Sequence, residues 1–481
     1  AAAGGEVPLT PIQHWFLAQE VPARDHWNMS LLLRTAAGVD AAALARAVAA
    51  VSLHHDALRL RFRAGDGGWR QETAPPAAAT TAVVDLSALG EDGWAAAVEA
   101  GCARLQRSLS IADGPLLRAA RFDLGAGRPG RLMLAAHHLA MDGVSWRVLL
   151  DDLRAAYEAA ARGEAPEGAL PGRTTPYRRW AERLRDHAAD GGFDAEIPFW
   201  TDPARADARP VPADHPGGRP TWGSARGVGL SLTEDETEAL LREVPRACHA
   251  HTQEALLAAA ARAVAGCTGS ARVLVDVEGH GREEIFPGVD LSRTVGWFTT
   301  LYPVLVDLSG AAGPMDAARA ARDRLRAVPQ RGIGHGALRW LHPRAEVRDA
   351  LAAVPRAQLR FEYMGQVDGS VGGGGDALFD VAPEGAGPAT DPRGEPSHAF
   401  SVNAVVAGGR MRLRWTYGEA VHRRETAERL LEAMAAELRA LVAHCRSGAP
   451  AALTPADFPL ADLDEEGLFA IEEMLRLEED L

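Results

Sequence analysis

Lysine is missing from this sequence: all 51 basic residues among its 481 positions are arginine. The chain therefore has neither the Schiff-base lysine that pyridoxal phosphate needs nor the lysine of a nucleotide-binding phosphate loop. Its four cysteines are scattered without a Cys-x-x-Cys pair, which argues against a zinc site, an iron–sulfur cluster or a disulfide framework. Any chemistry falls to imidazole, carboxylate, hydroxyl and guanidinium groups.

Long apolar runs and a surplus of positive charge are missing too. No run of about 20 apolar residues and no basic-then-apolar N-terminus occurs, so we expect neither a membrane span nor a signal peptide. The formal net charge of -14 disfavours nucleic acid as a partner, because phosphate binding needs a basic stripe. With 47% hydrophobic and 24% charged residues, the composition is that of a globular protein, and we expect it in the cytoplasm.

A chain of 481 residues is too long for one ordinary core, so we expect two lobes. Strand-like and helix-like segments mix in both halves, which indicates the α+β or α/β class. The predicted order is an upstream linker at 1–7, a first lobe at 8–201, a Pro- and Gly-rich crossover at 202–220, a second lobe at 221–450 and an acidic segment at 451–481. The last segment has a helical pattern and is either a docking element or a solvated linker helix.

The most informative stretch is AAHHLAMDGVSWR, at residues 135–147. The apolar run Leu132–Ala136 predicts a buried strand, and a helix is predicted to begin near Asp142, whose carboxylate can cap it. His138 thus follows a strand end and precedes a helix N-terminus, where free N–H groups can stabilise a developing oxyanion. We take His138 as the reactive centre, although on this string alone a structural role for both histidines is equally open.

A second strand ends in a carboxylate. In the stretch VLVDVE at residues 273–278, valine alternates with other residue types, which predicts a strand with Glu278 at its end. The sequence GHGR follows directly at residues 279–282.

Several motifs stand in order along nearly the whole chain: PIQHWF at 11–16, HHLAMDGVSW at 137–146, EGHGRE at 278–283, TVGWFTTLYPV at 294–304 and FEYMGQ at 361–366. Together they resemble the epimerization domains of nonribosomal peptide synthetases, which are members of the condensation-domain superfamily. The Val-Ser-Trp after Asp-Gly and the EGHGRE string favour epimerization over peptide-bond formation.

This resemblance implies two chloramphenicol-acetyltransferase-like lobes that form a V-shaped pseudo-dimer around a central tunnel. It implies an aminoacyl or peptidyl thioester as substrate, carried on the phosphopantetheine arm of an upstream peptidyl carrier protein. No metal and no tightly bound cofactor are expected, and the domain is expected to be monomeric. A downstream protein of the same synthetase is a further candidate partner, through the C-terminal acidic helix.

Inversion of an α-carbon needs a base on one face and an acid on the other. Given the resemblance, we expect His138 and Glu278 to fill these roles from different lobes, and we expect burial to raise the pKa of Glu278. Tyr363 matches a tyrosine near the family's site and could hydrogen-bond the substrate or the enolate oxygen. A core role for Tyr363 is equally open.

The remaining residues of the motifs are expected to support the site. His137 is expected to be structural, because adjacent strand residues point to opposite sides. Asp142 is expected to form a buried ion pair with Arg59 or Arg61, with direct proton transfer as the less favoured alternative. The others are Gly143, within the Asp-Gly motif; Ser145, as helix cap or substrate donor; Arg282, around Glu278 or on the surface; and Trp146 and Trp297, as packing residues.

Two positions depart from the family pattern: Glu362, where asparagine is usual, and His335, where tyrosine is common in the predicted glycine-rich turn 332–336. Either could alter the substrate range. Two other functions remain open. One is a condensation-type acyltransferase, in which His138 orients an attacking amine, and the other is an inactive carrier-docking domain.

Overall fold

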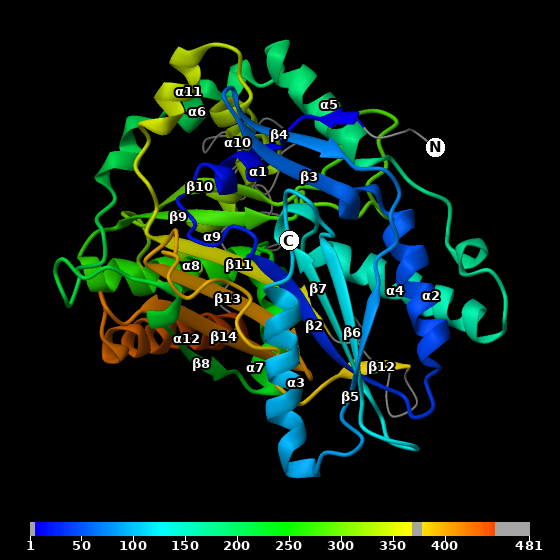
Figure 1. Cartoon of the computed structure of the whole chain (residues 1–481). Helices are drawn as coiled ribbons and strands as arrows, with labels where there is room; N and C mark the ends of the chain where they lie inside the picture. The colour runs from blue at the N-terminus through cyan, green and yellow to red at the C-terminus, as the bar shows by residue number, and fades with distance from the viewer. Residues whose placement is uncertain (1–4, 368–377, 448–481) are drawn as a thin grey trace, which may run out of the picture.

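A computed structural model describes residues 5–367 and 378–447. Three β-sheets with helices packed between and around them make up this part of the chain (Figure 1). The predicted α+β class is therefore confirmed. Within the described ranges, no helix is long and apolar enough to cross a membrane.

The five-stranded sheet has the order β12-β2-β7-β6-β5. Every residue of its central strand, β7, is buried, because helices cover both faces. Met133 and Ala135 pack with α3, whereas Leu132 and Leu134 belong to the main core that includes α2 and α4. The bounds are β2 Asn28–Thr35, α2 Ala41–His54, β5 Thr81–Asp85, α3 Glu91–Gln106, β6 Leu117–Asp123, β7 Arg131–His137, α4 Gly143–Ala161 and β12 Phe379–Val381.

The six-stranded sheet has the order β10-β9-β11-β13-β14-β8, and one of its faces is packed against helices (Figure 1). On β9 the predicted alternation is confirmed: Val275 and Val277 are fully buried, whereas Asp276 and Glu278 are only partly buried. Bounds are β8 Ala225–Ser231, α7 Glu234–Cys248, α8 Thr252–Thr268, β9 Arg272–Gly279, β10 Thr300–Asp307, α9 Pro314–Arg326, β11 Leu359–Gln366, β13 Phe400–Ala407, β14 Arg410–Gly418 and α12 Arg424–Arg446.

The third sheet is small and corrects the predicted linker. Its strands are β1 (Gly5–Val7), β3 (Leu60–Gly65) and β4 (Gly68–Thr73), in the order β1-β4-β3. Residues 5–7 are therefore part of the fold, and Val7 is buried. Residues 1–4 lie outside the described ranges.

Other helices pack against β10, against the small sheet or against one another: α1 Pro11–Leu17, α5 Tyr177–Ala189, α6 Ile197–Trp200, α10 Ile333–Trp340 and α11 Ala345–Ala352. In the segment predicted as a glycine-rich turn, 332–336, Gly332 has the left-handed conformation (φ 85°) of a turn glycine, but residues 333–336 form the first turn of α10, so the prediction is wrong for these residues. A side chain on Gly334 would clash with Glu196, and one on Gly336 would clash with Pro11. Glycine is needed here for close packing of a helix rather than for a turn.

One strand crosses from the second predicted lobe to the sheet of the first. β12 comes from the second half of the chain, yet it pairs antiparallel with β2 of the first, with Phe379 opposite Thr35. Residues 221–450 therefore do not form one closed lobe. β8, the first strand of the six-stranded sheet, begins at Ala225, soon after the proposed crossover. The predicted acidic segment 451–481 lies outside the described residues.

Candidate active site

His138 lies directly after β7, in a short 3-10 turn. Its ring stands 4.4 Å from that of Trp297, and its Nδ1 is buried without a hydrogen-bond partner among the described residues. Burial lowers the pKa of His138; backbone groups of His138 and Met141 and the charge of Asp142 oppose this shift, and the charge of Arg360 adds to it. His138 is therefore a neutral imidazole near pH 7, and a neutral imidazole has one ring nitrogen that can accept a proton.

His137 uses both ring nitrogens inside the protein. Nε2 lies 2.9 Å from the carbonyl oxygen of Arg24, and Nδ1 accepts the backbone N–H of Leu139 at 3.1 Å. This pattern assigns the proton to Nε2. The residue is fully buried, and burial lowers its pKa to about 4. The geometry agrees with the expected structural role.

Asp142 caps α4, as the sequence predicts, and its carboxylate is fully occupied. Oδ1 accepts the backbone N–H of Ser145 and the guanidinium of Arg282, both at 2.9 Å. Oδ2 accepts the backbone N–H of Phe298 at 3.1 Å. Both carboxylate oxygens are engaged inside the protein, which favours the structural role of Asp142 over direct proton transfer.

The prediction that Asp142 pairs with Arg59 or Arg61 is wrong. Arg59 donates to the carbonyl of Leu53, and Arg61 donates to that of Leu60, each at 2.7 Å. The ion pair is instead made by Arg282, which follows β9 in the second half of the chain. The β9–β10 connection lies over the start of α4, a juxtaposition that no local pattern in the sequence reveals.

Arg282 also ties its own loop together. Its Nη1 donates to the carbonyls of Leu291 and Thr294 at 3.2 and 2.6 Å, and its guanidinium lies over the ring of Phe298. Nη2 reaches Ser145 Oγ at 2.9 Å. Arg282 therefore organises the surroundings of Asp142, and not those of Glu278 as we expected.

Ser145 is likewise engaged within the protein. Its Oγ lies 2.8 Å from Asp142 Oδ1 and accepts the backbone N–H of Gly296 at 3.1 Å. Of the two roles left open, the geometry favours the structural one. Trp146 is buried in the core, as expected. A side chain on Gly143 would meet nothing within 4 Å, so open space borders the N-terminus of α4.

Glu278 lies near the end of β9, and its Oε2 is 3.4 Å from Arg360 Nη1. Burial is the main cause that raises the pKa of Glu278 to about 7, Glu362 and Asp142 raise it further, and Arg360 opposes them. The predicted upward shift is confirmed. The charges of Asp142 and Arg360 act on both Glu278 and His138. The two expected catalytic groups thus share one electrostatic environment, although they come from different halves of the chain.

Strand alternation separates Glu362 from Tyr363. On β11, Phe361 is fully buried in the core and Tyr363 has the same parity, whereas Arg360 and Glu362 have the other. The departure from asparagine at position 362 therefore adds a charge beside Glu278; the Glu362 carboxylate accepts from the Asn403 side chain. Tyr363 has its pKa raised by burial alone. Its catalytic role stays a prediction, and the strand parity does not favour it.

Sequence reasoning missed Arg360. Its alternation with Phe361 on a predicted strand was the available clue, but its pairing with Glu278 depends on the parallel register of β9 and β11. Among the described residues, His54, His55 and Asp152 are the one group with metal-ligand spacing. Asp152 already pairs with His55 and Arg293, so its charge is compensated without a metal ion.

A family model described as "Condensation domain" matches residues 3–462. The chain belongs to the condensation-domain family. It is 41% identical to a linear gramicidin synthase protein of Brevibacillus parabrevis over 467 residues, which are 97% of this chain and 9% of that protein. It is 39% identical to chondramide synthase cmdD of Chondromyces crocatus over 485 residues, 99% of this chain and 12% of that one. The condensation-family domain thus spans about a tenth of these relatives.

Solved structures agree with the family. The epimerization domain from the third module of tyrocidine synthetase B is 30% identical, with a TM-score of 0.84 over 93% of this chain and 99% of that one. The X-domain from teicoplanin biosynthesis is 19% identical, with a TM-score of 0.72 over 93% and 96% of the two chains, and shares the fold. The resemblance to the condensation superfamily is confirmed.

Proposed function

We propose that this condensation-family domain equilibrates the L and D forms of an aminoacyl or peptidyl thioester. The substrate is held on the phosphopantetheine arm of an upstream peptidyl carrier protein, and no other cofactor is needed. One observation carries the proposal: His138 is a neutral imidazole, and Glu278, whose pKa is raised to about 7, shares its charged neighbours Asp142 and Arg360. One group is ready to accept a proton while the other is ready to give one.

In the forward step, His138 removes the α-proton, and the electron pair of the C–H bond moves into the thioester carbonyl to give an enolate. Glu278 then delivers its proton to the opposite face of the α-carbon, and the carbonyl re-forms. The thioester bond stays intact throughout. The product state holds His138 protonated and Glu278 ionised, and the reverse reaction or proton exchange with solvent restores the starting state.

The enolate oxygen needs stabilisation by fixed dipoles. Helix α4 begins at Gly143, five residues after His138, and open space borders its N-terminus. The partial positive charge of a helix N-terminus stabilises an anion placed there. Asp142, Ser145 and Arg282 hold this N-terminus against the β9–β10 connection and are positioning residues.

Condensation is the second candidate. The family name suits it, and the neutral imidazole of His138 can also accept a proton from an attacking amine. In that case the raised pKa of Glu278 would have no role. The two functions therefore differ in what they require of Glu278. An inactive docking domain would require neither residue.

The test is deuterium incorporation at the α-carbon of a carrier-bound substrate in D2O. His138→Ala and Glu278→Gln are compared with His215→Ala and Glu432→Gln, which make the same changes at exposed positions outside the motifs. We expect incorporation with formation of the D-isomer in the wild type and in both control variants. D-isomer formation should fall by roughly a hundred-fold or more in both site variants, whereas incorporation from the L-substrate should be lost in His138→Ala only. Peptide formation with an amine acceptor that persists in Glu278→Gln would favour condensation instead.

A further inference from the structure

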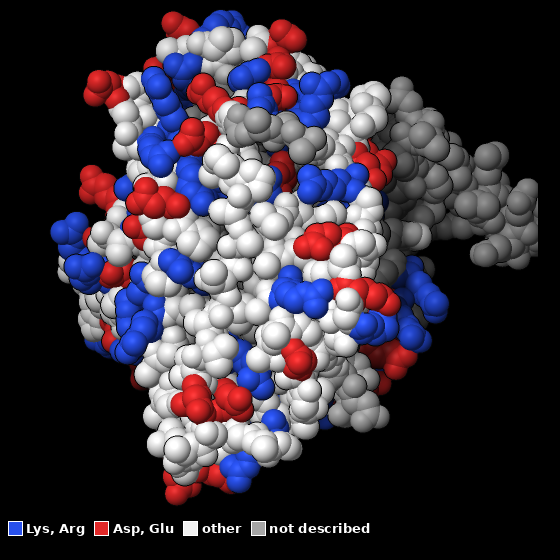
Figure 2. Space-filling view, turned by 45° about the vertical axis from the view of Figure 1, so that its right-hand side comes forward, with Lys and Arg blue, Asp and Glu red and all other residues white. Residues whose placement is uncertain are grey.

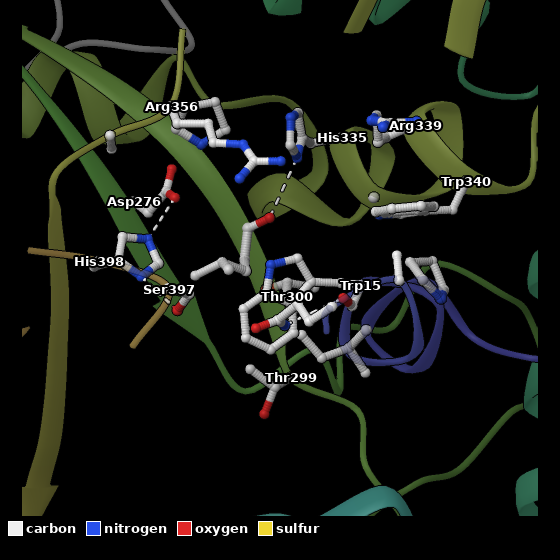
Figure 3. Close-up of a pocket in the computed structure, with 18 of the residues that line it drawn as sticks. Trp15, Asp276, Thr299, Thr300, His335, Arg339, Trp340, Arg356, Ser397 and His398 are labelled. Carbon is white, nitrogen blue, oxygen red and sulfur yellow. Dashed lines mark hydrogen bonds and ion pairs between the residues drawn. The ribbon is translucent and has the colours of Figure 1, made fainter. Parts of the chain in front are cut away.

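Reactive side chains outside the candidate active site include histidines in the wall of a cavity of about 680 Å³, which Trp297 also lines. His398 and Asp276 point toward each other in Figure 3 and are 2.8 Å apart. His335 Nδ1 lies 3.2 Å from the carbonyl oxygen of Leu301. Both histidines are thus engaged within the protein. No cysteine is among the described residues that line this cavity, so the thiols lie elsewhere.

Two cysteines that are 197 positions apart in the sequence lie in contact. The sulfur atoms of Cys248, at the end of α7, and Cys445, near the end of α12, are 3.8 Å apart. A disulfide bond needs a distance of about 2.05 Å between the two sulfurs. A change of side-chain rotamer moves a thiol sulfur by more than the difference, so the pair can be bridged without a rearrangement of the helices.

The contact between the sulfurs is part of a packed interface between two helices. Cys248 belongs to the main core, and Cys445 packs against that core. Arg446, the neighbour of Cys445, pairs with Asp235 and Glu243 of α7, each at 2.8 Å. The two sulfurs therefore face each other in the folded protein itself, and no loop has to move to bring them together.

The two thiols differ in exposure and in acidity. Cys248 is fully buried, whereas Cys445 is partly exposed. The hydrogen bond from the Cys248 thiol lowers the pKa of Cys445, although burial and the charge of Glu243 oppose this shift. The same hydrogen bond, together with burial, raises the pKa of Cys248. Cys445 is therefore the thiol that ionises first and the one that a small oxidant reaches.

From this contact we infer that Cys248 and Cys445 are a site of reversible oxidation, at which a peroxide joins them by a disulfide bond and a thiol reductant separates them. The Cys445 thiolate attacks one oxygen of hydrogen peroxide, the O–O bond breaks, and a sulfenic acid and water form. The Cys248 sulfur then attacks the Cys445 sulfur, the S–O bond breaks, and a second water leaves. The thiols lose two electrons and two protons in total, and the peroxide takes up both.

The disulfide bond joins α7 covalently to α12. It closes the stretch of chain between the two helices, which contains Glu278, Arg282 and Arg360. A cross-link between residues far apart in the sequence stabilises the folded state, because it restricts the unfolded chain. Oxidation should therefore stabilise the part of the protein that carries these three residues. The inference is independent of the proposed function.

The test starts from wild-type protein that is reduced with dithiothreitol, freed of the reductant and treated with hydrogen peroxide. Free thiols are then alkylated with N-ethylmaleimide in denaturant, and the protein is analysed by mass spectrometry before and after proteolysis. We expect a cross-linked peptide that joins Cys248 to Cys445, and both cysteines should be lost to alkylation. The oxidised protein should melt roughly 5 °C above the reduced protein, and dithiothreitol should reverse both changes.

Two variants serve as controls. Cys267→Ala removes the exposed cysteine of α8 and should show the same bond and the same rise in melting temperature. Cys445→Ala should form no bond, and peroxide should not raise its melting temperature. A Cys248 that stays open to alkylation in the peroxide-treated wild type would overturn the inference, as would a bond from Cys248 to Cys102 or Cys267 instead. A melting temperature that does not rise when the bond forms would also overturn it.

Discussion

Burial raises the pKa of Glu278, and of its charged neighbours Glu362 raises this pKa further and Arg360 lowers it. Because the proposed reaction needs one proton on the His138–Glu278 pair, activity should fall as the pH rises through about 7 and Glu278 ionises. Below neutral pH, activity should fall when His138 becomes protonated, at a pH below the ordinary value of 6.5.

We expect Glu362→Gln to move the alkaline limb of the pH–rate profile to lower pH, by about one unit, because loss of a negative neighbour lowers the pKa of Glu278. Arg360→Gln should move the same limb to higher pH. It should also move the acid limb upward, since Arg360 lowers the pKa of His138. The measurement is kcat/KM for α-proton exchange from pH 5 to 9, and shifts of the same sign in both variants would contradict the assignment.

The buried pair of Arg282 and Asp142 should be important for stability. Arg282→Met leaves the buried carboxylate of Asp142 uncompensated, and we expect it to lower the free energy of unfolding by about 3–5 kcal/mol. The double variant Arg282→Met, Asp142→Asn should recover part of that loss. Urea unfolding of the wild type, both single variants and the double variant gives the coupling between the two residues. If the two single changes in the free energy of unfolding add up to that of the double variant, the two residues do not interact.

Glycines inside helices offer a test of helix packing. Gly334 in α10 has its virtual Cβ 1.9 Å from Glu196 Oε2, whereas Gly266 in α8 has nothing within 4 Å. We expect Gly334→Ala to destabilise the protein by about 1–3 kcal/mol through overpacking. Gly266→Ala should stabilise it by up to about 1 kcal/mol, because alanine favours the helix. Equal effects in thermal unfolding would argue against the close approach of Glu196 to α10.

Elements with a strong local pattern could be predicted from the sequence. Strand β7, the cap at Asp142 and the alternation of β9 each depend on residues close together in the chain. The start of α10 could not be predicted, because its glycines resemble those of a turn. Their role in packing becomes visible only when Glu196 and Pro11 are known to lie against them. Arg282 and Arg360 were misassigned or missed for the same reason: their partners lie on other segments.

The whole molecule is held together by segments that cross between its halves. β12 extends the sheet of the first half, and Phe379 on it is 3% exposed. A strand of three residues has too weak a pattern to reveal its partner, so the pairing of β12 with β2 could not be predicted. On the face shown in Figure 2, basic and acidic side chains are interspersed around a largely uncharged centre, without one continuous basic stripe among the described residues.

We expect Phe379→Ala to lower the free energy of unfolding by about 3–5 kcal/mol, because it leaves a cavity where β12 packs onto the first half of the chain. Asp380→Asn removes the half-exposed ion pair with Arg34 and should cost less than about 1 kcal/mol. The β2 amides should also exchange their hydrogens faster in Phe379→Ala than in Asp380→Asn. A small effect of Phe379→Ala would show that β12 contributes little to the joining of the halves.

The decisive measurement follows deuterium wash-in from the pure L and the pure D substrate separately, in the wild type and in Glu278→Gln. With a base on each face, the variant should still exchange the enantiomer whose α-proton faces His138, with retention of configuration, and should fail to exchange the other. The wild type should exchange both and interconvert them. Exchange and inversion of both enantiomers at wild-type rates in Glu278→Gln would contradict the two-base mechanism.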